Sequence, residues 1–164
     1  MTAEAALVQL NHLLHVGLTT PELLEQRHVT IARHPGTLGL GLVIGRADGR
    51  VESVAESRAQ HLMWLHDVPA PVPQYEVVDH RGVVEYRLDF AWPERRKWLE
   101  VDGLVKYRMP ARVGEDAGDV VLRERRREDD VRRITGWRVM RITWADLERP
   151  VQTARRILAF LAEA

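Results

Sequence analysis

Residues 87–103 read RLDFAWPERRKWLEVDG, and this stretch decides how the rest of the chain is organised. Apolar residues alternate with other residues on both sides of a Pro-Glu-Arg turn at 93–95. Such alternation is typical of strands that are buried on one face. The stretch therefore predicts two antiparallel strands joined by a short turn.

A hairpin that is symmetric about Glu94 and Arg95 brings two acidic residues together, because Asp89 then lies directly opposite Glu100. Directly opposed residues have Cβ atoms roughly 4.5–5.5 Å apart, and like charges at that spacing destabilise a sheet. A divalent cation relieves the repulsion, and Mg²⁺ and Mn²⁺ prefer carboxylate, carbonyl and water oxygens. The pair therefore predicts a Mg²⁺ or Mn²⁺ site.

The same register predicts an apolar face on the other side of the hairpin and places Arg87 opposite Asp102. The predicted members of the apolar face are Leu88, Phe90, Leu99 and Val101.

Composition sets limits on the protein class. With 164 residues and 45% hydrophobic content, the chain can bury a core of its own. It has no cysteine, which excludes disulfides, thiolate zinc sites and cysteine nucleophiles, and we expect a cytoplasmic location. No apolar run approaches the ~20 residues that a membrane span needs, so no membrane partner is expected. The net charge is zero, which gives no support for general polyanion binding.

The flanking segments predict an α/β fold, a mixed sheet flanked by helices. Helices are predicted over 3–15, from Pro21 to about 27, over 54–65, over 120–134 and from Pro150 onward, and further strands over 74–78, 83–92 and 137–143. In 54–65, Val54, Leu62 and Leu65 are predicted to face inward. Residues 1–48 are predicted to form a helical N-terminal extension, which could act as a dimerisation arm, and 49–164 the main domain.

This order of elements, with its motifs, resembles the PD-(D/E)xK nuclease superfamily. The closer resemblance is to the bacterial endonuclease-domain family related to the very short patch mismatch repair endonuclease. The motifs are Ala55-Glu56-Ser57-Arg58, Arg87-Leu88-Asp89-Phe90, Glu100-Val101-Asp102-Gly103, and a late strand from Gly136 leading to Asp146-Leu147. The resemblance implies a restriction-endonuclease-like sheet, a three-stranded meander plus one further strand.

The resemblance also implies a ligand set. It assigns the metal to Glu56, Asp89 and Glu100, with the carbonyl of Val101 as a further ligand. Gln74 matches a glutamine that is frequent in the family and is expected to hydrogen-bond near the metal. For Glu56, the alternative is a carboxylate that stabilises the first turn of its helix.

The chain departs from the superfamily at one position. Where the superfamily has a lysine two residues after the glutamate, this chain has Asp102. Lys106 is expected to take over the work of that lysine, and its alternative is a solvated loop residue. Asp102 is expected to be a metal or water ligand, or else the partner of Arg87 in an ion pair.

The predicted helix 120–134 carries a run of arginines. One interpretation is a phosphate-contacting face, because arginine engages phosphates through two hydrogen bonds at once. The other is a solvated face with ion pairs along the helix. The predicted DNA-binding residues are Gln74, Arg87, Arg123, Arg125, Arg126 and Arg127.

The resemblance predicts a metal-dependent DNA endonuclease, in DNA repair or in defence against phages and mobile elements. Its catalytic residues are expected to be Asp89, Glu100, Asp102 and Lys106. The alternative is a nuclease-like module that has lost catalysis and acts as an antitoxin or regulator. The missing lysine and the zero net charge support that alternative.

Overall fold

The computed structural model describes residues 1–32, 34, 37, 39–103 and 117–163. These residues form two compact units, Met1–Leu65 and His66–Ala164. The predicted domain boundary at residues 48 and 49 falls inside the first unit and remains a prediction. Lys106 lies outside the described residues.

The first unit is helical. Its helices are α1 (Ala3–His15), α2 (Pro21–Ile31), α3 (Leu40–Ile44) and α4 (Val54–Leu65). The side chains of Thr2 and Thr20 accept backbone hydrogen bonds at the starts of α1 and α2, where otherwise unpaired N–H groups need acceptors. The prediction for 3–15 is confirmed, and α2 runs further than predicted, to Ile31.

Asn11 joins α1 to α4 in this unit. Its side chain is fully buried and donates to Ser57 Oγ at 3.0 Å and to Gln60 Oε1 at 2.8 Å. Its Oδ1 accepts from the Asp48 amide at 2.8 Å. A buried amide with both ends paired fixes the register of the two helices.

The inward face of α4 differs from the prediction. Leu62 is buried as predicted, but Val54 and Leu65 are 53% and 61% exposed. They occupy the two ends of α4, whereas the small residues Ala55 and Ala59 are buried and allow a close approach to α1.

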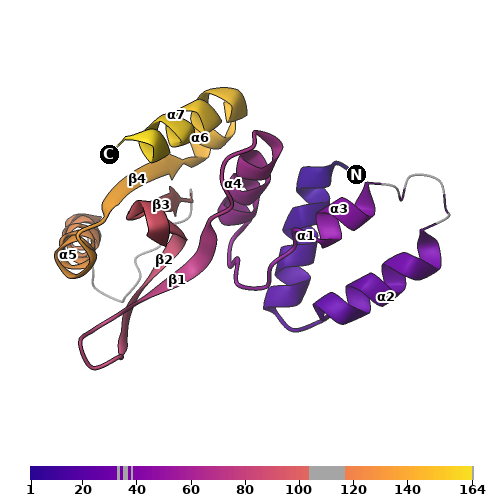
Figure 1. Cartoon of the computed structure of the whole chain (residues 1–164), viewed down its shortest axis with the longest axis horizontal. Coiled ribbons are helices and arrows are strands. Elements are labelled where there is room, and N and C mark those ends of the chain that lie inside the picture. The colour runs from indigo at the N-terminus through magenta and orange to yellow at the C-terminus, as the bar shows by residue number, and fades with distance from the viewer. Residues whose placement is uncertain (33, 35–36, 38, 104–116, 164) are drawn as a thin grey trace. The chain divides into compact units, whose positions relative to one another are not determined.

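The second unit is a four-stranded sheet with helices. Its elements are β1 (Val72–Val78), β2 (Val84–Trp92), β3 (Lys97–Asp102), α5 (Ala117–Thr135), β4 (Arg138–Thr143), α6 (Trp144–Leu147) and α7 (Pro150–Ala162). The strand order is β1-β2-β3-β4, with β4 parallel to β3 and the other pairs antiparallel (Figure 1). The predicted α/β class, meander and further strand are confirmed. No helix within the described ranges is long and apolar enough to cross a membrane.

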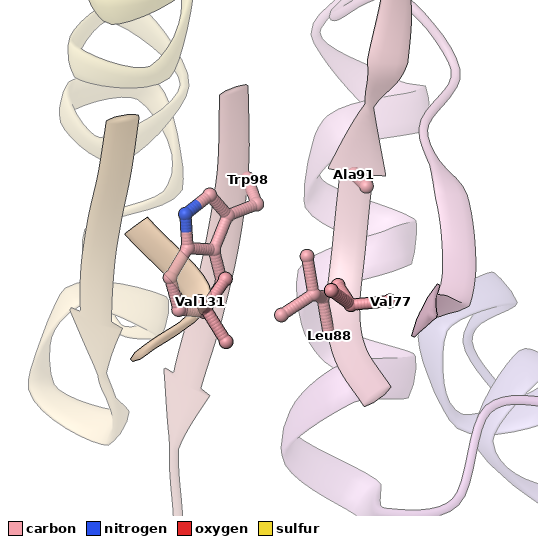
Figure 2. Close-up of a cluster of buried hydrophobic side chains, with 5 residues drawn as sticks. All are labelled: Val77, Leu88, Ala91, Trp98 and Val131. Atoms are coloured by element: carbon pink, nitrogen blue, oxygen red, sulfur yellow. The ribbon is translucent and has the colours of Figure 1, made fainter. Parts of the chain in front are cut away.

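A buried cluster joins one face of the sheet to α5. It contains Val77, Leu88, Ala91, Trp98 and Val131 (Figure 2). Because Trp98 and Leu99 are consecutive residues of a strand, they point to opposite faces. The prediction that Leu88 shares a face with Leu99 is therefore wrong.

Lys97 lies on the opposite face of the sheet and is hydrogen-bonded to the C-terminal end of α7. The Lys97 side chain is buried, and its Nζ donates to Leu161 O at 3.4 Å and also to Glu163 O. The same Nζ lies 5.3 Å from the centre of the Phe160 ring. A cation at this place satisfies carbonyl groups that the helix leaves unpaired at its C-terminus.

Lys97→Met is expected to destabilise the second unit by about 1.5–3 kcal/mol, because hydrogen bonds to charged groups contribute about that much. Urea unfolding followed by circular dichroism measures the change. Arg155→Ala is the matched control, since Arg155 is an exposed cation on α7. An unchanged midpoint for Lys97→Met would show that the carbonyl groups gain nothing from the lysine.

Candidate functional site

The predicted hairpin register is confirmed along the ladder between β2 and β3. Phe90 pairs with Leu99, and Trp92 pairs with Lys97. The recorded pairing stops at Phe90, one residue before Asp89. There the carboxylate of Asp89 accepts a hydrogen bond from the Val101 amide, with Oδ2 to N at 2.8 Å. Asp89 therefore lies against the peptide group that links Glu100 to Val101.

Gln74 marks an irregularity at the same level of the sheet. It lies between the pairs Pro73–Phe90 and Tyr75–Leu88, so it faces Asp89 in register. Its φ is 48°, in the left-handed region that a residue with a side chain rarely adopts. Strained residues of this kind gather at functional sites.

The irregularity explains the wrong prediction for Leu88. Leu88 and Ala91 both belong to the cluster beside α5, although they are three positions apart on β2. Strict alternation would send them to opposite faces. The break in alternation therefore lies between Leu88 and Ala91.

Glu100 is the most deeply buried carboxylate of this region. Its side chain is 1% exposed, and Arg127 from α5 lies 3.2 Å away, Nη2 to Oε1. The same Nη2 donates to the backbone carbonyl of Arg87 at 2.5 Å. A buried carboxylate needs such compensation, since an isolated charge is costly to bury. Arg127 thus links β2, β3 and α5.

Arg141 forms a second set of ion pairs on the same face. It lies next to Glu100 across the parallel pair of β3 and β4. Its guanidinium donates to Glu128 at 2.9 and 3.1 Å and to Asp102 at 3.4 Å. Burial pushes the pKa of Arg141 down, but the hydrogen bond to Glu128 and the charges of Asp102, Glu128 and Glu100 outweigh it, and the pKa lies above its usual value.

Asp102 therefore forms an ion pair with Arg141, which was not among the predicted site residues. One pattern could have revealed Arg141. It follows Trp137, which directly precedes β4, and Val139 of β4 at alternate positions, and both of these pack against the cluster that contains Trp98. A charged residue that continues a buried stripe needs a partner of opposite charge.

Glu56 belongs to the first unit and has a local role there. Its Oε2 accepts from the Glu52 amide at 3.0 Å, and its own amide donates to Ser53 Oγ at 3.1 Å. This is close to a capping box, which satisfies N–H groups at the start of a helix. It fits the alternative interpretation of Glu56, and its role as a metal ligand remains a prediction.

The predicted arginines of α5 separate into two groups. Arg127 is turned toward the sheet and is 22% exposed, whereas Arg125 and Arg126 are exposed to solvent. Arg132 and Arg133, in later turns of α5, are paired with Glu128 at 2.8 Å and Asp130 at 2.9 Å. Ion pairs along the helix are therefore present, and phosphate contact by Arg123, Arg125, Arg126 and Arg127 remains a prediction.

In the part of the chain that the structure describes, no group of three or more His, Asp or Glu side chains gathers so that it could hold a metal ion. The predicted metal site therefore depends on fewer than three such side chains from one unit. The second unit contributes to it the carboxylates of Asp89 and Glu100 and the carbonyl of Val101.

Two proteins of Mycobacterium tuberculosis resemble the chain. They are the uncharacterized protein MT2308 of strain CDC 1551 / Oshkosh and the uncharacterized protein Rv2248 of strain ATCC 25618 / H37Rv. Each is 34% identical to it over 119 residues, which cover 72% of the chain. The chain spans 40% of the length of each of these relatives. No family model matches the chain, and no solved structure matches it.

Proposed function

We propose that the chain is a metal-dependent DNA endonuclease with a restriction-endonuclease-like sheet. The observation that carries the proposal is the position of Asp89 and Glu100. They occupy neighbouring strands at the point where the ladder between β2 and β3 ends, and Asp89 is bonded to the peptide group next to Glu100. The order of helix, meander, helix, strand and helix supports it as well.

The donor set fits a hard divalent cation. Asp89, Glu100 and the carbonyl of Val101 offer only oxygen atoms, which Mg²⁺ and Mn²⁺ prefer. A carboxylate has about four acceptor positions, so the bond from the Val101 amide orients Asp89 without using its full capacity. When bound, the cation would activate water and neutralise charge on the scissile phosphate.

The residues around the pair have preparatory roles. The Val101 amide fixes the orientation of Asp89, and Arg127 lies 3.2 Å from Glu100, Nη2 to Oε1. Arg141 is held by Glu128 and Asp102, which keeps a further positive charge beside Glu100. Orientation of this kind reduces the reorganisation that the reaction would otherwise require.

Removal of the metal tests the proposal. The purified protein is expected to nick or cut supercoiled plasmid DNA in millimolar Mg²⁺ or Mn²⁺, and excess chelator is expected to stop the reaction. Gel electrophoresis of timed samples measures both. A preparation in which cleavage persists under chelation would point to another mechanism or to a contaminating nuclease, and a folded protein with no cleavage in either metal would contradict the proposal.

One observation favours the second candidate function, a nuclease-like binding module without catalysis. Asp102 stands where the superfamily has a lysine, and it is paired with Arg141. Calorimetry separates the two functions. Binding of Mn²⁺ that disappears in Glu100→Ala supports the enzyme, and a folded protein that binds neither Mn²⁺ nor Mg²⁺ supports the module.

A further inference from the structure

Arg127 differs from the other arginines that surround the carboxylates. Its recorded carboxylate partner is Glu100 itself, with Nη2 and Oε1 3.2 Å apart. Its second recorded bond, at 2.5 Å, goes to a backbone carbonyl of β2. A single guanidinium nitrogen therefore lies against both strands that carry the proposed metal ligands.

The neighbouring arginines have other acidic partners. Arg141 is shared by Glu128 and Asp102, and Arg132 is also bound to Glu128. Their positive charges are largely balanced before any substrate arrives. Arg127, in contrast, forms its ion pair with Glu100 itself.

Asp102 stands where the superfamily has a lysine, so the positive charge of that lysine is missing from this position. It follows Glu100 by two positions on β3, so both side chains lie on the face that α5 covers. An acidic side chain there cannot supply a positive charge to a phosphate. Lys106, the predicted substitute for that lysine, lies outside the described residues, whereas Arg127 of α5 lies beside Glu100.

We propose that Arg127 is a catalytic residue that contacts the scissile phosphate and stabilises the negative charge that develops on it. This inference rests on the proposed nuclease function. In the hydrolysis, the oxygen of water forms a bond to phosphorus and gives up one proton to solvent, while one P–O ester bond breaks and the departing oxygen takes up a proton from solvent. Arg127 stays protonated throughout, because an arginine effectively never loses its proton in a protein.

The test compares wild type with Arg127→Ala and Arg127→Lys in Mg²⁺-dependent plasmid cleavage at varied DNA concentration. Arg127→Ala is expected to lower kcat by about 10²–10³-fold, as the loss of one preorganised donor to a developing charge does. The KM for DNA is expected to change far less, because the contact strengthens in the transition state. Arg127→Lys is expected to recover part of the rate, since it keeps the charge but loses the planar geometry.

Mn²⁺ calorimetry without DNA provides the second measurement. A positive charge beside Glu100 opposes a bound cation, so Arg127→Ala is expected to bind Mn²⁺ more tightly, by about tenfold from the Coulomb repulsion removed. The measurement is made at pH 8 for every variant. A merely structural Arg127, needed only to hold Glu100 in place, would give the opposite result, weaker Mn²⁺ binding together with the loss of cleavage.

Arg133→Ala is the matched control, an exposed arginine of α5 that is paired with Asp130. Cleavage by Arg127→Ala at the wild-type rate, or weaker Mn²⁺ binding by that variant, overturns the inference and leaves the nuclease proposal intact. A wild-type protein that does not cleave DNA ends both. If circular dichroism shows that Arg127→Ala is unfolded, plasmid cleavage and Mn²⁺ binding are compared between wild type, Arg127→Gln and Arg127→Lys instead.

Discussion

Asp89→Asn is expected to lower metal-dependent DNA cleavage by at least about 10³-fold, since a metal at a phosphoryl group contributes several kcal/mol and each 1.36 kcal/mol changes the rate tenfold. The substitution removes one negative charge and keeps the shape of the side chain. The asparagine carbonyl can still accept the hydrogen bond from the Val101 amide that Asp89 accepts at 2.8 Å. The fold is therefore expected to survive while the rate collapses.

Plasmid cleavage kinetics measure the rate, and circular dichroism checks the fold. Glu85→Gln is the matched control, because Glu85 is an exposed carboxylate on the same strand. Cleavage by Asp89→Asn at the wild-type rate would remove Asp89 from the reaction. An equal loss in Glu85→Gln would show that the assay responds to the charge of the strand as a whole.

Trp98→Ala is expected to destabilise the second unit by about 3–5 kcal/mol, the usual cost of truncating a buried aromatic residue to alanine. Trp98 is fully buried and belongs to the cluster that joins the sheet to Val131 of α5. Loss of the indole ring leaves a cavity between the sheet and the helix. Urea unfolding followed by circular dichroism measures the effect.

Trp98→Phe provides the comparison. The indole Nε1 of Trp98 is buried and has no hydrogen-bond partner within the residues that the structure describes. Phenylalanine removes this unsatisfied donor, whose burial is itself unfavourable, and keeps most of the apolar volume. A cost in Trp98→Phe as large as that in Trp98→Ala would mean that the indole N–H makes a contact that stabilises the fold.

Local pattern was sufficient to predict much of the second unit. The turn at 93–95 and the alternation beside it gave the register that pairs Phe90 with Leu99. The helix from Pro150 was predicted from the helical preference for proline at its first turn, and it begins there. Hairpins and helix starts are fixed by residues that are near one another in sequence.

The wrong prediction for Leu88 and the missed residue Arg141 depend on contacts between distant segments. Leu88 was assigned to the wrong face because strict alternation was assumed, whereas the alternation breaks between Leu88 and Ala91. Arg141 was missed because its partners, Glu128 and Asp102, come from another helix and another strand. The spacing of residues within one segment does not show which distant residues that segment will contact.

The parallel pairing of β3 with β4 also determines when the proposed centre can be completed during synthesis. The hairpin of β2 and β3 can close once residue 102 has emerged from the ribosome, since its contacts are local. The balancing charges of Glu100 come from residues 127 and 141, on the crossover helix and the strand that follows it. A nascent chain that ends before residue 127 therefore holds both carboxylates without either arginine, and Glu100 acquires its native environment only when the ribosome has added the next forty or so residues.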